Sequence, residues 1–324
     1  MDPNTAMEAA TEGAKALTKF QEIIEKIFGP KWTRKQADAN AYADEKKLQT
    51  IRNNPDMEII YVGNEMHARE RTPEALAYRA EQRALAESIR QETNLENVLD
   101  IAANEVSQMK DVSDKPVDED WLTRLFQIVK DVSSEEMQLV WGKILAGEIK
   151  QPGSFSFRTL ETVRNLSQSD AEVFQKVIPL IVTHGDTHCI LSDTSILKKY
   201  GVRFSDVLTL GECGLINLEE LRLQLYVTNT MKSLVHTDSR LIVIAGSTVE
   251  EKMIKLNVYT LTKVGTELYS ILSHSINEPY LFDVADKLKK SNQENISKIT
   301  IHEINSISGE TINYKTAPIK EFIV

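Results

Sequence analysis

The chain has 324 residues, a formal net charge of −10 and 41% hydrophobic residues. This length is enough for two modest cores, and the composition excludes global disorder. The negative charge argues against a protein that mainly coats nucleic acid or anionic membrane, although a local basic face remains compatible with it. No apolar run reaches the ~18 residues of a membrane-spanning helix and no secretory signal is visible, so we expect a cytoplasmic protein.

Residues 5–28 are predicted to form an amphipathic helix that ends at Gly29-Pro30. Its apolar stripe packs either on a helix of the same or a neighbouring subunit, or against a membrane interface. The basic residues beside the stripe are few and are balanced by glutamates, which favours the protein contact. The residues expected at an oligomer or membrane interface are Leu17, Phe20, Ile24, Ile27 and Phe28.

A second long helix is expected from Thr72-Pro73 to about Ser107, after an irregular stretch at 51–64 that could include a short strand. The early part of this helix interleaves glutamate, arginine and alanine. That mixture is typical of a solvated or coiled-coil-like arm rather than of a face that binds nucleic acid.

Four further helices are predicted in quick succession between residues 117 and 180. Acids at Asp118–Asp120 mark the first start, a capping box of Ser133 with Glu136 the second, and Ser156 and Ser167 the third and fourth. Short connections between helices indicate a compact bundle. Trp121 and Trp141 are expected at its centre.

Three parts of this stretch resemble a known family: the Val132–Gly142 run with Trp121, then Ile144–Glu148, and the Pro152-Gly153-Ser154-Phe155-Ser156 turn. They are similar to the uncharacterised bacterial family catalogued as domain of unknown function 2806. The resemblance extends more loosely over most of the chain, including Gly29-Pro30, and implies no activity, cofactor or catalytic residue. A weaker similarity in helix order to abortive-infection alpha-type proteins points towards phage defence.

The second half is predicted to mix short helices with strands. Two helices, at 195–200 and 205–210, precede Gly214-Leu215-Ile216; alternating β-branched runs at 240–245 and 252–261 follow and are expected to form a two-stranded hairpin. The next segment, Leu261-Thr262 with Gly265, opens another helix. This order resembles winged-helix domains, with an intervening segment at 218–234 that is longer than a minimal wing. A terminal helix at 280–290 and a hairpin closed at Ser308-Gly309 complete the chain.

A DNA-reading winged helix needs cations along its recognition helix, because phosphate neutralisation supplies most of the affinity. The possible nucleic-acid contacts here are Lys198, Lys199 and Arg203, and nearby acids offset them. The charge balance therefore favours a winged helix that contacts protein, with DNA binding as the alternative.

The sequence contains no pattern of residues typical of catalysis. His184 and His188 have helical spacing, but Gly185-Asp186 between them indicates a polar loop after a helix rather than a metal site. Cys213 reads as a small buried residue, and there is no phosphate loop, nucleophile elbow or dinucleotide fingerprint. We therefore expect no enzymatic activity, no cofactor and no metal.

Together these patterns predict an α+β protein that is mostly α. We expect helical arms (1–116), a helical bundle core (117–180), a winged-helix-like domain (181–275) and a C-terminal helix with a β-hairpin (276–324). The leading functional hypothesis is a non-enzymatic interaction or scaffold protein of phage defence that forms homo-oligomers through its N-terminal helices and senses a protein partner. The alternatives are a DNA-binding transcriptional regulator and a membrane-acting effector that uses its first helix.

Overall fold

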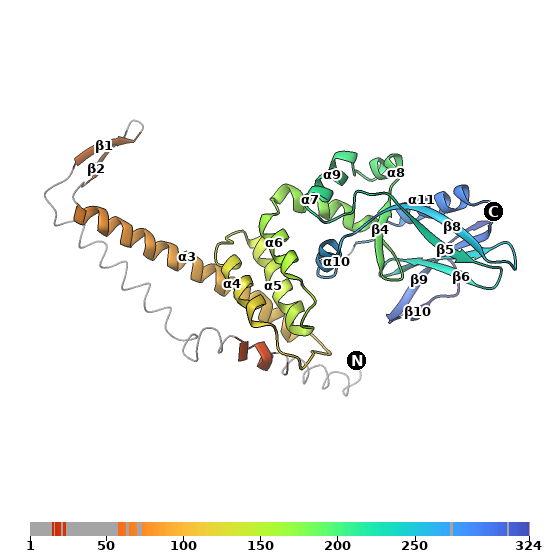
Figure 1. Cartoon of the computed structure of the whole chain (residues 1–324), viewed down its shortest axis with the longest axis horizontal. Coiled ribbons are helices and arrows are strands. Elements are labelled where there is room, and N and C mark those ends of the chain that lie inside the picture. Colours follow the sequence, from red (N-terminus) through yellow and green to blue (C-terminus); the bar gives the residue numbers. More distant parts are fainter. Residues whose placement is uncertain are drawn as a thin grey trace. The chain divides into compact units, whose positions relative to one another are not determined.

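The computed structural model describes residues 15, 17–20, 22–23, 58–62, 65–69, 73–272, 275–309 and 311–323. It divides into two compact units, Met1–Phe155 and Ser156–Val324. The division falls inside the stretch 117–180 that the sequence groups into one bundle. The α+β class is confirmed, since helices and a large antiparallel sheet are both present (Figure 1).

The N-terminal unit contains an antiparallel pair, β1 (Glu58–Val62) with β2 (Glu65–Arg69), and the helices α3 (Pro73–Ser107), α4 (Glu119–Val129) and α5 (Glu135–Lys150). Helices α3 and α5 pack closely at Gly142, where an added Cβ would lie 2.3 Å from the Ile101 side chain. A glycine is required at position 142, because any larger residue would overlap the Ile101 side chain of α3. Trp121 and Trp141 are buried, as expected.

The helix starts of this unit follow the local sequence. The Asp118 carboxylate accepts the Trp121 N–H at 2.9 Å and caps α4. Helix α5 begins one residue later than predicted, because Ser134 rather than Ser133 is its N-cap. The Ser133 hydroxyl instead accepts hydrogen bonds from the side chains of Asn94 and Arg90, both on α3.

Glu148, near the end of α5, folds the turn that follows it. Its carboxylate is 2% exposed and accepts the backbone N–H groups of Gly153 (2.6 Å) and Phe155 (2.9 Å). The Trp121 indole N–H donates to the Phe155 carbonyl at 2.8 Å. Hydrogen bonds within the N-terminal unit therefore hold the turn at residues 152–155. They give the Glu148 carboxylate and the Trp121 indole N–H the partners that buried polar groups need.

The C-terminal unit begins with α6 (Phe157–Asn165) and α7 (Gln168–Val177), capped by Ser156 and by a Ser167–Asp170 capping box as predicted. A short 3-10 turn, η2 (Ile178–Leu180), leads into the sheet. The helices α8 (Thr194–Lys199), α9 (Phe204–Glu212), α10 (Lys263–Tyr269) and α11 (Glu278–Ser291) are distributed along the rest of the chain.

A nine-stranded sheet forms the centre of this unit, in the order β10-β9-β7-β6-β3-β4-β8-β5 with β11 paired to β9. All of the pairings in it are antiparallel, and the inner strands bury the large aliphatic side chains of the core. The strands are β3 (Val182–His184), β4 (Thr187–Leu191), β5 (Leu221–Val227), β6 (Lys232–His236), β7 (Arg240–Gly246), β8 (Lys252–Thr260), β9 (Ile296–Ser308), β10 (Thr311–Tyr314) and β11 (Lys320–Ile323).

This sheet is strongly curved. Strands β5 and β6 are consecutive in the chain, yet β8, β4 and β3 lie between them in the sheet. Four strand spacings amount to about 19 Å, whereas the connection between β5 and β6 is folded into a turn in which the Thr228 N–H donates to the Met231 carbonyl at 2.9 Å. So tight a turn requires the sheet to curl until β5 approaches β6.

Two predictions for the second half of the chain are wrong, one for a strand pairing and one for a loop. The expected hairpin of 240–245 with 252–261 is wrong: β7 pairs with β6 and β9, and β8 pairs with β4 and β5. The stretch 218–234, predicted only to be longer than a minimal wing, forms β5 and the start of β6. These strands pair with β8 and β7, respectively. The polar loop predicted at 184–188 is a β-hairpin, β3–β4, whose two-residue turn uses Gly185 at φ 55°. The β9–β10 hairpin is confirmed.

The Gly214-Leu215-Ile216 segment packs against the start of α10 at Thr262 and Gly265. An added Cβ on Gly265 would lie 2.1 Å from the Leu215 carbonyl oxygen, so α10 packs directly on the Gly214–Ile216 backbone. The Thr262 N–H donates to that same carbonyl at 3.0 Å, and the Thr262 hydroxyl caps α10 by accepting the Gly265 N–H. The Glu267 carboxylate in turn accepts the Ser156 N–H at 2.8 Å and secures the start of α6.

Candidate interaction surface

Helix α9 is the element that the winged-helix resemblance places in the recognition position. Its N-cap is Arg203, whose N–H donates to the Asp206 carboxylate at 2.9 Å. Asp206, Val207 and Leu210 face the core. The opposite face carries Phe204, which is 54% exposed, and Leu208, which is 38% exposed.

Leu218 extends this apolar face. Residues 204, 208 and 211 lie on one side of a helix because they are four and three positions apart. Gly211 leaves room there for Leu218, whose side-chain carbons would lie 2.3 to 2.6 Å from an added Cβ, and Leu218 is itself 44% exposed. We call Phe204, Leu208 and Leu218 the α9 surface. Single exposed apolar residues are ordinary, but three side by side on a helix and its flanking loop form a patch.

The cations near this surface are mostly engaged within the chain. The Lys199 ammonium lies 2.6 Å from the Asp283 carboxylate of α11, which also accepts the Tyr200 hydroxyl at 2.6 Å. The Arg203 guanidinium lies 3.4 Å from Asp206. In the described part of the chain, Lys198 is exposed and has no ion pair. Of the three predicted nucleic-acid contacts, only Lys198 presents an uncompensated charge.

The predicted interface on the first helix lies partly inside the N-terminal unit. Phe20 is 9% exposed and Leu17 is half-buried, whereas Ile24, Ile27 and Phe28 lie outside the described residues. A buried Phe20 has little apolar surface left for a membrane or another subunit. Among the described helices, none is both long and apolar enough to cross a membrane.

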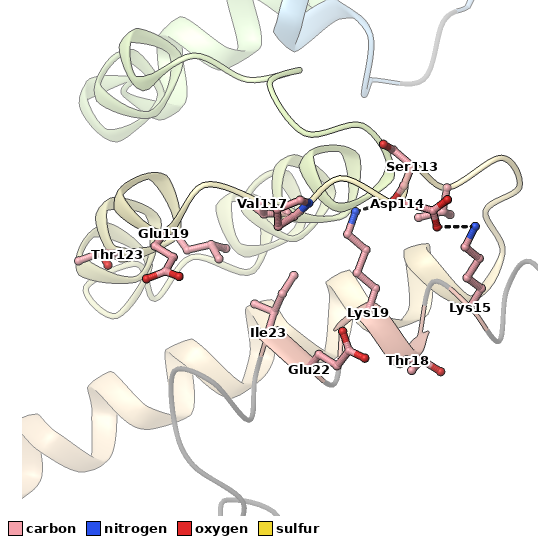
Figure 2. A pocket seen from close by; sticks show the side chains of 13 residues that line it. Lys15, Thr18, Lys19, Glu22, Ile23, Ser113, Asp114, Val117, Glu119 and Thr123 are labelled. Carbon is pink, nitrogen blue, oxygen red and sulfur yellow. Dashed lines mark hydrogen bonds and ion pairs between the residues drawn. The ribbon is translucent and has the colours of Figure 1, made fainter.

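Two lysines hold this first helical segment in place, as Figure 2 shows. The Lys19 ammonium donates to the carbonyls of Ser113 (2.7 Å) and Ile149 (3.0 Å), so it satisfies a carbonyl near the C-terminal end of α5. Burial lowers the pKa of Lys19 below its usual value. Lys15 lies 2.7 Å from Asp114.

A cavity of about 630 Å³ lies between this helical segment and the stretch 112–123 (Figure 2). Ile23, Val117 and Leu122 supply apolar walls, while Glu22 and Glu119 border it. Its two lysines are occupied by the carbonyls and the carboxylate described above. Among the described residues that line it, the two lysines are therefore not free to bind an anionic ligand.

The side chains of His184, His188 and Cys189 have structural roles. Cys189 is buried, and burial raises the pKa of its thiol to about 12, which removes it as a nucleophile near neutral pH. The His188 ring lies against Tyr269 with its Nδ1 2.8 Å from the Thr183 hydroxyl, and His184 Nδ1 lies 2.8 Å from the Leu234 carbonyl. Within the described residues, no group of three or more His, Cys, Asp or Glu side chains is arranged to hold a metal ion.

The apolar α9 surface was not predicted from the sequence, although a signal for it exists. Residues 204–212 read Phe-Ser-Asp-Val-Leu-Thr-Leu-Gly-Glu, and their apolar positions cover two sides of a helix rather than one. A helix at the edge of a small domain can bury only one side, so the second side must remain exposed or meet a partner.

A family model described as a protein of unknown function (DUF2806) matches residues 78–285, well over half of the chain. The chain belongs to this family. The DUF2806 match includes α9 and the turn held by Glu148, but it begins after Gly29-Pro30, to which the resemblance was expected to reach. The first helical segment and the strands β9, β10 and β11 also lie outside it. Neither a curated protein nor a solved structure matches the chain.

Proposed function

We propose that this protein is a non-enzymatic interaction protein whose C-terminal unit contains a winged-helix-like module adapted to protein contact. The support for the module is its element order: α8 and α9 are followed by β5 and β8, which pair with each other, and then by α10. On this interpretation β5 and β8 are the wing strands, and residues 228–251 are an insertion between them that contributes β6 and β7.

The observation that carries the proposal is the apolar character of the α9 surface. A helix that reads DNA presents cations to phosphates and polar side chains to base edges. Here the corresponding face presents Phe204, Leu208 and Leu218, which would be left in water beside a DNA groove. Aromatic and aliphatic side chains in a patch are instead what a protein partner buries at the centre of an interface.

The charges around the patch indicate the kind of partner. Glu212 and Glu219 are exposed next to Gly211 and Leu218, and Arg203 at the start of α9 is paired with Asp206. An acidic rim around an apolar centre complements a segment with apolar side chains bordered by lysine or arginine. We therefore assign the α9 surface to a basic, amphipathic segment of a partner protein.

The proposal is tested with two labelled 18-residue helical peptides, one of leucine and lysine and one of leucine and glutamate in the same pattern. The full chain should bind the lysine peptide at least tenfold more tightly, as measured by fluorescence anisotropy. Phe204→Ser combined with Leu208→Ser should abolish this binding. Ile323→Ser, which changes a 69% exposed isoleucine on β11, should leave it intact. Equal binding by the Phe204→Ser, Leu208→Ser variant would overturn the assignment.

The DNA-regulator alternative is tested on the same instrument with labelled duplex DNA over a salt series. The protein-contact proposal predicts no salt-sensitive binding by α9, because Lys198 alone cannot supply the phosphate contacts that a DNA duplex needs there. Binding that is lost when Lys198, Lys199 and Arg203 are replaced by Glu would instead establish the regulator.

We propose phage defence as the biological setting on the strength of the abortive-infection resemblance, and homo-oligomer formation through the N-terminal helices as the mode of assembly. Plaque counts on cells with and without the gene test the first. Light scattering of the full chain and of a chain lacking residues 1–30 tests the second: an oligomer that falls to a smaller species on truncation supports it, and a monomer in both forms refutes it.

A further inference from the structure

A polar groove of about 590 Å³ lies in the C-terminal unit, bordered by the outer face of β5 and β8, the start of α8 and the end of α11. This volume falls within the range of small-molecule sites, which is roughly 300–1,000 Å³. None of its lining residues belongs to the α9 surface. The lining contains three cations and two acids: Arg222, Lys255, Lys287, Asp193 and Glu220.

Two of these cations are uncompensated. Lys287 lies 2.8 Å from Asp193, so their charges cancel. Arg222 and Lys255 are exposed and make no ion pair in the described part of the chain. Arg222 pairs with Asn257 and Lys255 with Gln224 in the β5–β8 register, which makes the two cations diagonal neighbours on one sheet face. Diagonal neighbours have Cβ atoms within about 8 Å of each other, so both side chains can reach one anion.

The frame behind the cations is rigid. The Asn292 side chain accepts the Lys255 N–H at 3.1 Å and donates to the Lys255 carbonyl at 3.2 Å, so α11 is clamped to β8. Asp193 caps α8 while it pairs with Lys287, and the Ser192 N–H donates to the Asn257 carbonyl at 3.1 Å. A site whose walls are already ordered loses little entropy when it binds a ligand.

We propose that this groove binds the phosphate group of a small phosphorylated molecule. Arg222 supplies a fork of donors that matches phosphate oxygens, and Lys255 adds a second positive charge. Ser192, Ser291 and Asn257 line the groove and offer polar contacts for the remainder of the molecule. Two free cations in a concave site suit one phosphate ester, whereas duplex DNA needs a longer row of cations.

Glu220 gives the proposal an internal check. Its carboxylate accepts the Asn257 amide at 2.6 Å and has no cation paired with it in the described residues. A negative charge beside a phosphate opposes binding, so its removal should tighten binding while removal of either cation should weaken it.

The test is calorimetric titration of the full chain with adenosine monophosphate and with glucose 6-phosphate, each compared with its unphosphorylated parent and with inorganic phosphate. We expect saturable binding of the phosphorylated compounds only, weakened about tenfold by Arg222→Gln and by Lys255→Gln and strengthened about threefold by Glu220→Gln. Lys232→Gln, which removes an exposed lysine of β6 outside the groove, should change nothing.

Three results would overturn the proposal. The first is no saturable binding at millimolar ligand by the wild-type chain. The second is an equal loss with Lys232→Gln, which would show a general charge effect. The third is duplex DNA that binds more tightly than any small phosphate and depends on Arg222 and Lys255, which would make the groove part of a nucleic-acid surface. None of these results bears on the lysine-peptide assay of the α9 surface.

Discussion

Helix α5 of the N-terminal unit buries Trp141, Ile144, Leu145 and Ile149, whereas α9 of the C-terminal unit leaves Phe204 and Leu208 in solvent. Each helix has a glycine against which an aliphatic side chain lies: Ile101 on Gly142 and Leu218 on Gly211. In α5 that contact joins two long helices into a core. In α9 it enlarges an exposed patch, so the comparison separates a helix that stabilises the fold from one whose outer face is available to a partner.

The comparison is tested most strongly by removing a large side chain from each helix. Leu145→Ala should lower the free energy of unfolding by about 2–5 kcal/mol, because a fully buried leucine leaves a cavity. Leu208→Ala should cost less than about 1 kcal/mol, since its side chain is 38% exposed. Trp121 and Trp141 are buried in the N-terminal unit, so tryptophan fluorescence in denaturant follows the effect of Leu145→Ala. Amide hydrogen exchange in the C-terminal unit measures the effect of Leu208→Ala. Equal losses of stability in the two variants would contradict the distinction between α5 and α9.

The two glycines give a second, smaller contrast. Gly142→Ala should destabilise the N-terminal unit by about 1–3 kcal/mol, because Ile101 and the Ala102 backbone leave no space. Gly211→Ala should be close to neutral, since the exposed Leu218 can rotate away and alanine is a better helix former by about 1 kcal/mol. Thermal unfolding followed by circular dichroism measures both. A larger loss at Gly211 would show that Leu218 is fixed in place.

The glutamates near the ends of the two helices provide a third contrast. Glu148→Ala should cost about 1–3 kcal/mol, because the buried Phe155 N–H and the partly buried Gly153 N–H lose their acceptor. Glu212→Ala, at the exposed end of α9, should change stability by less than about 0.5 kcal/mol. Limited proteolysis provides the measurement: Glu148→Ala should speed cleavage in the 151–156 turn, and an unchanged rate would mean that the turn does not depend on this carboxylate.

The smallest expected effect is a pH dependence in the C-terminal unit. Hydrogen bonds from Lys287 and Ser195 hold the pKa of Asp193 below its ordinary value. A lowered folded-state pKa stabilises the unit above the unfolded pKa of about 4, and this contribution disappears as the pH falls further. Asp193→Asn should therefore lower the melting temperature by a few degrees at pH 7 and by less at pH 2. A loss of equal size at both pH values would contradict the charge argument.

Much of the helical architecture could be predicted because its signals are local. Asp118, Ser156 and Ser167 cap the helices that they were expected to cap, since a short polar side chain and a backbone N–H three residues on are enough. The shift of one residue at Ser134 has a tertiary cause, because α3 occupies the Ser133 hydroxyl.

Strand pairing was not predictable in the same way. The alternating runs at 240–246 and 252–260 identify strands, but alternation specifies which side of a strand is buried and not which strand lies next to it. Strands β5 and β6 come from a stretch without a clear period, and they displace the expected β7–β8 hairpin.

The sequence by itself determined the family, the helix starts, the burial of Trp121 and Trp141 and the presence of strands in the second half, because these depend on spacing along the chain. Only the tertiary structure decided the sheet order, the pairing of Lys199 with Asp283 and the meeting of Arg222 with Lys255 on one face. It also decided that the outer face of α9 is apolar and exposed. Each of these depends on which distant segments become neighbours, and no local pattern encodes that.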